Sequence, residues 1–303
     1  MMEKMKVFLN LMGSHHSVYA ELLKYPPENV SYSYPETKGL YGQSFRPDSL
    51  SRKVLKAIYS PLPALYYVRG AGHADLIHST NSLMLLNNKN WVVDTEHVGG
   101  FLRFRSERYS SVFYKNIISR ILRRNSCKGI LTWSEAAKKS LSAYFGDASA
   151  IIKKTRTIYP AVHPSDKPTQ KPKKKFRFLF VSRLFYEKGG REILEAFMKT
   201  KKKIDCSLTF IGNAPEEFRN KYSAHVDFVE PRLNRTQMAE TFSRHHALVF
   251  PTYADTFGFV ILEAMAAGLP VISTNVFCVP ELIKDGSSGI VLEAPVKWHD
   301  EHF

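Results

Sequence analysis

The chain has little cysteine, no long apolar run and no grouping typical of metal ligands. No run reaches the roughly 20 apolar residues that a membrane-spanning helix needs, so we expect no such helix. Cys127, Cys206 and Cys278 are scattered and odd in number, which predicts a reduced protein without a disulfide framework. No close Cys/His spacing occurs, and we predict no metal site. The first residues carry an acid and soon turn polar, unlike a signal peptide, so we expect a cytoplasmic protein.

Acidic residues are scarce in the first half of the chain. Residues 1–165 hold 23 Lys and Arg against 11 Asp and Glu, whereas the remainder holds 20 against 17, for a net charge of +15 overall. The positive excess in the first half predicts an anionic partner, such as a membrane surface, a nucleic acid or a phosphorylated ligand. With 303 residues, 44% of them hydrophobic, the chain is long enough for two globular domains.

Short apolar runs alternate with segments of helical pattern along the whole chain. The expected strands are 6–12, 30–34, 75–79, 91–96, 129–134 and 155–160 in the first half, and 176–182, 207–212, 226–230, 247–252, 270–274 and 289–294 in the second. Several of these runs are almost continuously apolar. Strands of that kind, separated by helix-length segments, indicate parallel sheets covered on both faces, so the fold class is α/β.

A segment rich in Pro and Lys, residues 163–175, separates the two sets of strands. We therefore predict an N-terminal domain over 1–165, a linker over 166–175 and a C-terminal domain over 176–303. Both domains are expected to be doubly wound and Rossmann-like, facing a central cleft that binds the ligand.

The stretch DTFGFVILEAMAAG, residues 255–268, is apolar or glycine from Phe257 to Ala267 except for Glu263. It predicts a helix buried on all sides that ends at Gly268. A buried carboxylate needs donors, and the first-turn amides from Phe257 to Val260 form an anion site beside Asp255. Two acids that bracket an anion site suit a nucleotide sugar. The alternative is a capping Asp and a Glu paired within the core.

Two cations follow the strand expected at 176–182. Arg183 and Lys188 precede Gly189 and Gly190, which open a new helical pattern. This loop lies at the carboxyl end of a strand, where open α/β sheets bind their ligands. Arg and Lys both bind phosphate oxygens, although a solvated loop also explains such a pair.

SRLFYEKGGREILEAF (182–197), LTFIGNAPEE (208–217) and PTYADTFGFVILEAMAAGLPVISTNVFCVPELI (251–283) resemble the C-terminal half of retaining GT-B glycosyltransferases. That family, the group 1 glycosyltransferases, includes bacterial phosphatidylinositol mannosyltransferases, sucrose synthases and glycogen synthases. The likeness runs from about residue 176 to 293, with further similarity at 130–146 and 157–162. Family members continue past the strand at 289–294 with further helices, which we expect to be missing here.

The resemblance implies a role for each matching residue. Arg183 and Lys188 match residues that contact the donor diphosphate and stabilise the departing nucleotide. Asp255 and Glu263 match the two acids of a Glu–seven residues–Glu motif, of which the first lies against the donor sugar and the second holds the ribose. The family usually has Glu where Asp255 stands. The turn of Phe257, Gly258, Phe259 and Val260 matches the one whose amides meet sugar and phosphate.

The first domain matches the family less closely. A glycine-rich loop usually follows the first strand, and here LMGSHHS (11–17) offers Gly13 as a candidate donor contact. His97, at the expected carboxyl end of a strand, matches a histidine near the donor sugar and is a candidate catalytic residue with Arg183, Lys188 and Asp255. His78 also lies at a strand end, and a structural role is open for either histidine.

Residues 101–128 hold eight Lys or Arg and one acid. Phe113, Ile117, Ile121 and Leu122 fall on one helical stripe, with Arg120, Arg123 and Arg124 crowding the end of the helix. This pattern predicts a basic amphipathic helix on an anionic membrane, peripheral on the cytosolic face. The alternative is a domain helix with a solvated basic face.

We therefore predict a retaining glycosyltransferase that moves a sugar from a UDP- or GDP-linked donor to a glycan or lipid-linked acceptor, without a metal cofactor. The competing interpretation is a catalytically degenerate GT-B module that docks to an anionic membrane or another anionic partner. We do not expect a nucleic-acid partner. A phosphorylase or a nucleotide-sugar epimerase is a further enzymatic alternative, but no lysine stands out as placed for a pyridoxal cofactor.

Overall fold

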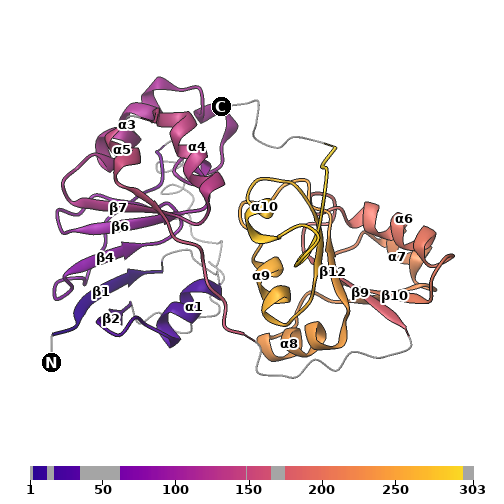
Figure 1. Cartoon of the computed structure of the whole chain (residues 1–303). Helices are drawn as coiled ribbons and strands as arrows, with labels where there is room; N and C mark the ends of the chain where they lie inside the picture. Colours follow the sequence, from indigo (N-terminus) through magenta and orange to yellow (C-terminus); the bar gives the residue numbers. More distant parts are fainter. Residues whose placement is uncertain (1–2, 12–16, 35–61, 148, 165–174, 296–303) are drawn as a thin grey trace, which may run out of the picture. The chain divides into compact units, whose positions relative to one another are not determined.

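The computed structural model describes residues 3–11, 17–34, 62–147, 149–164 and 175–295 (Figure 1). The contacts between residues divide the chain into two units, Met1–Pro160 and Ala161–His302. The boundary falls near the predicted end of the first domain, and the predicted linker lies almost entirely outside the described residues.

The first unit is built on a six-stranded parallel sheet with the order β2-β1-β4-β6-β7-β8. Its strands are β1 (Met5–Asn10), β2 (Val30–Ser33), β4 (Leu76–Ser79), β6 (Trp91–Thr95), β7 (Cys127–Thr132) and β8 (Thr155–Thr157). The helices are α1 (Ser17–Lys24), α3 (Val112–Leu122), α4 (Glu135–Phe145) and α5 (Ala150–Lys153), with 3-10 turns η1 (Val98–Gly100) and η2 (Ser106–Arg108). Two short strands that we did not predict, β3 (Leu65–Tyr66) and β5 (Met84–Leu85), pair with each other.

The second unit has a parallel sheet of its own with the order β11-β10-β9-β12-β13-β14. The strands are β9 (Phe176–Ser182), β10 (Cys206–Gly212), β11 (Val226–Val229), β12 (Ala247–Phe250), β13 (Val271–Thr274) and β14 (Gly289–Leu292). The helices are α6 (Gly190–Thr200), α7 (Glu216–Tyr222), α8 (Arg235–Arg244), α9 (Phe259–Ala266) and α10 (Val279–Leu282). Renumbered from β9, the strand order is 3-2-1-4-5-6, that of a dinucleotide-binding fold.

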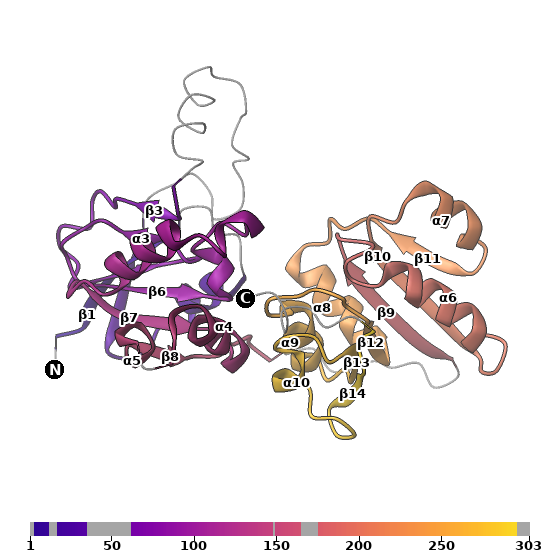
Figure 2. The ribbon, with the colours of Figure 1, turned by 90° about the horizontal axis from the view of Figure 1, so that it is seen from above.

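Helices cover both faces of the second sheet. Figures 1 and 2 show α6 and α7 on one face and α8, α9 and α10 on the other, as right-handed crossovers require when the strand order reverses. Neighbouring residues of β9 accordingly enter different cores. Leu179 packs with Leu248 and Ile261, whereas Phe180 packs with Phe210. The near-continuous apolar runs of the sequence thus reflect burial on both faces.

The predicted apolar stripe of α3 is used by the core of the first unit. Ile121 and Leu122 are buried together with Ile118, and Ile117 packs against the same cluster. Phe113 alone of the predicted stripe is strongly exposed, at 61%. The interpretation of this stripe as a membrane-facing surface is therefore wrong, because the helix turns it toward the sheet of its own domain.

No helix in the described part of the chain is both long and apolar enough to cross a membrane. The described residues also contain no group of three or more His, Cys, Asp or Glu side chains placed to hold a metal ion.

Candidate functional site

The candidate site lies at the carboxyl edge of the second sheet, where strands β9 and β12 are neighbours. The chain leaves β9 toward β10 and leaves β12 toward β13, on the opposite side of the sheet. This reversal is the topological switch point at which open α/β sheets bind their ligands. The loops after β9 and β12 carry five of the predicted site residues: Arg183, Lys188, Asp255, Phe257 and Gly258.

The loop after β9 is held close to the loop after β12 by glycine. Gly189 has a left-handed backbone, with φ of 72°, and a Cβ at this position would collide with the carbonyl oxygen of Pro251. The backbone of Tyr253 donates to the carbonyl of Glu187 at 2.9 Å. Only glycine permits this approach without strain. The close approach brings Lys188 to the second loop.

Asp255 organises the second loop. Its Oδ1 accepts from the amides of Phe257 at 3.2 Å and Gly258 at 2.9 Å. Gly258 takes a left-handed conformation, with φ of 79°, directly before α9. The carboxylate therefore closes the turn that precedes the helix, whereas the N-cap of α9 itself is Gly258, which has no side-chain cap.

Lys188 and Asp255 are bound to each other. The Lys188 Nζ lies 2.9 Å from Asp255 Oδ2, and the two side chains are 12% and 14% exposed. The same Nζ donates to the carbonyl oxygen of Ala254 and lies 5.6 Å from the centroid of the Phe250 ring. Two residues predicted separately from two loops thus form one ion pair, which the sequence analysis did not foresee.

The first turn of α9 is partly engaged by the chain itself. Of the amides from Phe257 to Val260 that we predicted as an anion site, the first two donate to Asp255. The ring of Phe257 is buried and lies 5.0 Å from that of Phe259. The Asp255 carboxylate therefore already binds the two amides at the start of this segment, where the partial positive charge of the helix lies.

Arg183 and Glu263 are both accessible at least in part, although Glu263 was expected on a helix buried on all sides. Arg183 is exposed just beyond β9, and among the described residues it has no hydrogen-bond or ion-pair partner. Glu263 is half-buried, and α9 buries only Ile261 and Ala264 fully. The prediction of a helix buried on all sides is therefore wrong. The helix packs one face on β12 and β13, and the residues around that face stay partly accessible.

His97 lies just beyond the carboxyl end of β6, as predicted, but it is fully buried. Its Nδ1 accepts from the amide of Gly99 at 2.9 Å, so the ring caps the 3-10 turn η1. The ring of Phe104 stacks on it with centroids 6.3 Å apart. His97 therefore has the structural role that the sequence analysis left open, since its ring caps η1. Gly13, by contrast, lies outside the described residues.

A second carboxylate, which the sequence analysis passed over, stands at the carboxyl edge of the first sheet. Asp94 of β6 accepts from the Tyr19 hydroxyl at 2.8 Å and from the amide of Asn81 at 2.9 Å. Its Oδ2 also lies 3.0 Å from Nε2 of His78. Burial, followed by the nearby Asp94 charge, raises the pKa of Tyr19 well above its usual value. The signal was an acid inside the apolar run WVVDT, the same kind of oddity as Glu263.

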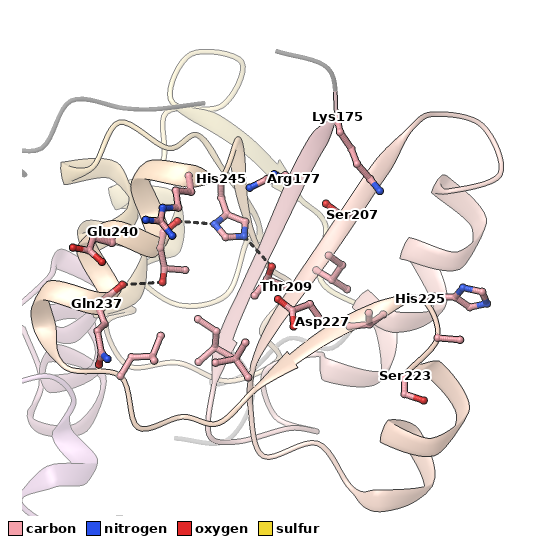
Figure 3. Close-up of a pocket in the computed structure, with 18 residues that line it drawn as sticks. Lys175, Arg177, Ser207, Thr209, Ser223, His225, Asp227, Gln237, Glu240 and His245 are labelled. Carbon is pink, nitrogen blue, oxygen red and sulfur yellow. Dashed lines mark hydrogen bonds between the residues drawn. The ribbon is translucent and has the colours of Figure 1, made fainter. Parts of the chain in front are cut away.

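A hollow of about 790 Å³ opens in the second unit, mostly toward the amino ends of β9, β10 and β11. Figure 3 shows His245 on its wall, bonded to the hydroxyl of Thr209 at 3.0 Å and to the carbonyl of Thr241 at 2.6 Å. Arg177, Asp227 and Glu240 also line it, so both signs of charge are present. The hollow holds none of the predicted site residues.

Comparisons with known proteins agree with the geometry of the second unit. Residues 163–300 match the family model described as glycosyl transferases group 1. The chain is 30% identical over 138 residues to the D-inositol 3-phosphate glycosyltransferase of Paenarthrobacter aurescens, a match covering 41% of this chain and 34% of that protein. The matched stretch thus spans about a third of the length of such curated relatives.

Solved structures resemble the fold across nearly the whole chain. The lipopolysaccharide outer core galactosyltransferase WaaB, in its apo form, aligns with a TM-score of 0.62 and 16% identity over 96% of this chain and 87% of its own. HepE of Anabaena, in complex with UDP and glucose, aligns with the same score and identity over 96% and 86%. Residues 163–300 of this chain therefore resemble the group 1 glycosyltransferases, and the chain as a whole has the GT-B fold.

Proposed function

We propose that the protein is a glycosyltransferase that takes a sugar from a UDP- or GDP-linked donor and moves it to a glycan or lipid-linked acceptor. The observation that carries the proposal is the meeting of Lys188, Asp255 and the start of α9 at the switch point of the second sheet. The family match over residues 163–300 and the structural likeness to a protein solved with UDP and glucose support it.

In this proposal the donor diphosphate lies between the two loops. Lys188 and the exposed Arg183 provide positive charge for the phosphate oxygens, and the first turn of α9 adds the partial charge of its amides. These groups stabilise the negative charge that develops on the departing nucleoside diphosphate. The fixed cations take the part that a divalent metal plays in other phosphate chemistry, so we propose a metal-independent reaction.

Glu263 is proposed to hold the ribose hydroxyls. It lies on α9, one turn beyond Phe259, where the helix begins, and its half-buried position leaves the carboxylate within reach of a ligand at the sheet edge. Transfer with retention of the anomeric configuration is proposed from the resemblance of the matched segments to retaining enzymes. His97, which is buried and caps η1, is proposed as a residue near the donor sugar from the resemblance alone. The product anomer, assigned by proton NMR, tests retention directly.

The central test removes one cation or one acid. We expect Lys188→Ala and Glu263→Ala each to lower turnover of UDP- or GDP-sugars by about a hundredfold or more, because each removes a charged contact to the donor in the transition state. Turnover is measured as release of UDP or GDP, with circular dichroism to confirm folding. Lys199→Ala is the matched control, since Lys199 is an exposed lysine of the last turn of α6. Near-normal turnover in both variants would falsify the proposal.

A binding module without activity is the second candidate, and one surface favours it. Phe104, Val112 and Phe113 are all more than half exposed in a segment that also exposes Arg103 and Arg105. Such a surface suits peripheral binding to the anionic cytosolic face of a membrane, and an active enzyme could use it as well. Phosphatidylglycerol vesicles at low salt test membrane binding, with phosphatidylcholine vesicles as the control. Calorimetry with UDP and GDP separates the two candidates, because a degenerate module binds neither nucleotide.

A further inference from the structure

In the proposed donor site, Lys188 forms an ion pair with Asp255 of the same site. The Nζ and Oδ2 atoms lie 2.9 Å apart, and neither side chain is more than 14% exposed. Charges with so little exposure are costly without a partner, so each side chain of the pair holds the other in place. Any phosphate that binds Lys188 must therefore compete with Asp255.

Asp255 is turned toward its own loop. A carboxylate has about four acceptor positions, and three are used here, by the amides of Phe257 and Gly258 and by Lys188. The hydrogen bonds to Oδ1 fix the backbone before α9, whereas Oδ2 contacts Lys188 and no other polar group among the residues that the structure describes. Oδ1 thus stabilises the loop backbone, and Oδ2 binds the Lys188 ammonium group.

We propose that Asp255 is a positioning residue, the internal counter-ion of Lys188, which the diphosphate of a bound nucleotide replaces. This proposal rests on the proposed function, which supplies the nucleotide as the ligand. It differs from the resemblance, which implies that Asp255 contacts the donor sugar. Lys188 exchanges a carboxylate for phosphate oxygens, and Asp255 keeps its cap. Arg183, exposed beside the loop and unbonded within the described part of the chain, is the second cation that the phosphate meets.

The two roles of Asp255 differ in which ligands they affect. A carboxylate that contacts the sugar matters only to ligands that carry a sugar. A counter-ion of Lys188 weakens the binding of any diphosphate, because it neutralises the cation and repels the anion. Inorganic pyrophosphate has no base, ribose or sugar, so it responds to the second role alone.

The experiment measures pyrophosphate affinity by isothermal titration calorimetry. Asp255→Asn keeps an oxygen that can accept from the turn amides but removes the negative charge that faces Lys188. We expect this variant to bind pyrophosphate about fivefold more tightly than the wild type, the worth of a partly accessible ion pair. Lys188→Ala should abolish the gain when combined with Asp255→Asn. Asp227→Asn removes an exposed acid near the amino edge of the same sheet and should change nothing.

Unchanged or weaker pyrophosphate binding by Asp255→Asn overturns the proposal, as does a gain that survives Lys188→Ala or the absence of binding by every variant. If Asp255→Asn does not fold, Asp255→Ser supplies an uncharged capping oxygen for the same comparison. UDP and GDP are titrated in parallel. Failure of both nucleotides with a Lys188-dependent gain for pyrophosphate refutes the proposed function and leaves the counter-ion role standing.

Discussion

Each of the two parallel sheets carries an acid at its carboxyl edge, and the two acids have different partners. In the first unit, Asp94 is 4% exposed and receives hydrogen bonds from Tyr19 of α1 and from the amide of Asn81, with His78 of β4 alongside. In the second unit, Asp255 is 14% exposed and faces the cation of Lys188.

The difference indicates that Asp94 stabilises the fold, whereas Asp255 is proposed to influence ligand binding through Lys188. The partners of Asp94 come from three segments, and Asn81 adopts a left-handed backbone, with φ of 54°, where it donates. Such a sealed network specifies one arrangement and is costly to break. Asp255 accepts from two amides of its own loop, and its second oxygen faces the side chain of Lys188, whose ammonium group also suits phosphate oxygens. The same architecture thus holds a fixed acid in one unit and an exchangeable one in the other.

The largest expected effect comes from breaking the sealed network. Asp94→Ala removes the short-range acceptor of the buried Tyr19 hydroxyl and the acceptor of the part-buried Asn81 amide, so we expect the free energy of unfolding of the first unit to fall by about 3 kcal/mol. Urea denaturation followed by tryptophan fluorescence measures it, because Trp91 and Trp133 both belong to this unit.

Asp75→Ala is the matched control for Asp94→Ala. Asp75 also accepts a backbone hydrogen bond, from Lys6 at 2.7 Å, but it is exposed, so water replaces the lost partner. We expect a loss of less than about 1 kcal/mol. Equal losses in the two variants would show that burial of Asp94 does not set its contribution, and the contrast with Asp255 would lose its basis.

A smaller effect is expected from the loop that presents Lys188. Gly189→Ala adds a Cβ against the carbonyl of Pro251 in a left-handed conformation, which should lower the free energy of unfolding of the second unit by about 2 kcal/mol and displace Lys188. Gly286→Ala is the control, since its φ of 71° is similar but no atom lies within 4 Å of the added Cβ. Thermal unfolding and pyrophosphate titration together check this prediction. Equal effects in both variants would refute the importance of the close loop approach.

The fold was predictable because hydrophobic pattern determines it locally. All twelve predicted strands are present, with bounds shifted by at most two or three residues at their ends. The short strands β3 and β5 were missed because two residues carry no periodic signal. In the site, strand order alone placed Lys188 and Asp255 at one edge. Their ion pair was not predictable, because it depends on the Gly189 approach and on side-chain directions.

Two other errors have physical reasons. The network of Asp94 joins residues up to 75 positions apart, and such contacts leave no mark on local sequence. The apolar stripe of α3 was predicted to face a membrane. The helix α9 was predicted to be buried on all sides. Composition fixes how apolar a helix is, but the neighbouring elements decide which of its faces are covered. Ile121 is in the core of its unit, and Glu263 remains half-accessible.

The smallest expected effect concerns a histidine far from either acid. His245 is buried, and its Nδ1 faces the carbonyl of Thr241, so that nitrogen carries the proton and Nε2 accepts from Thr209. Burial first, and then the charge of Arg177, lower the pKa of His245 below its usual 6.5, against the opposing effects of Thr241 and Asp227. The unfolded chain therefore binds this proton at a higher pH than the folded protein does.

It follows that His245 contributes its full stability above about pH 6.5 and loses it as the pH falls from there through the lowered pKa of the folded state. His245→Asn keeps a donor toward Thr241 and removes the titration, so the fall in free energy of unfolding between about pH 7.5 and 5.5 should shrink by roughly 1 kcal/mol or less. Urea titrations at several pH values measure this slope. His225→Asn, at an exposed histidine of the same unit, is the control, and an equal change of slope in both variants would contradict the assignment. His245, which is held by Thr241 and Thr209, thus stabilises the fold as Asp94 does. The Lys188–Asp255 pair differs from both, because we propose that a ligand replaces one of its members.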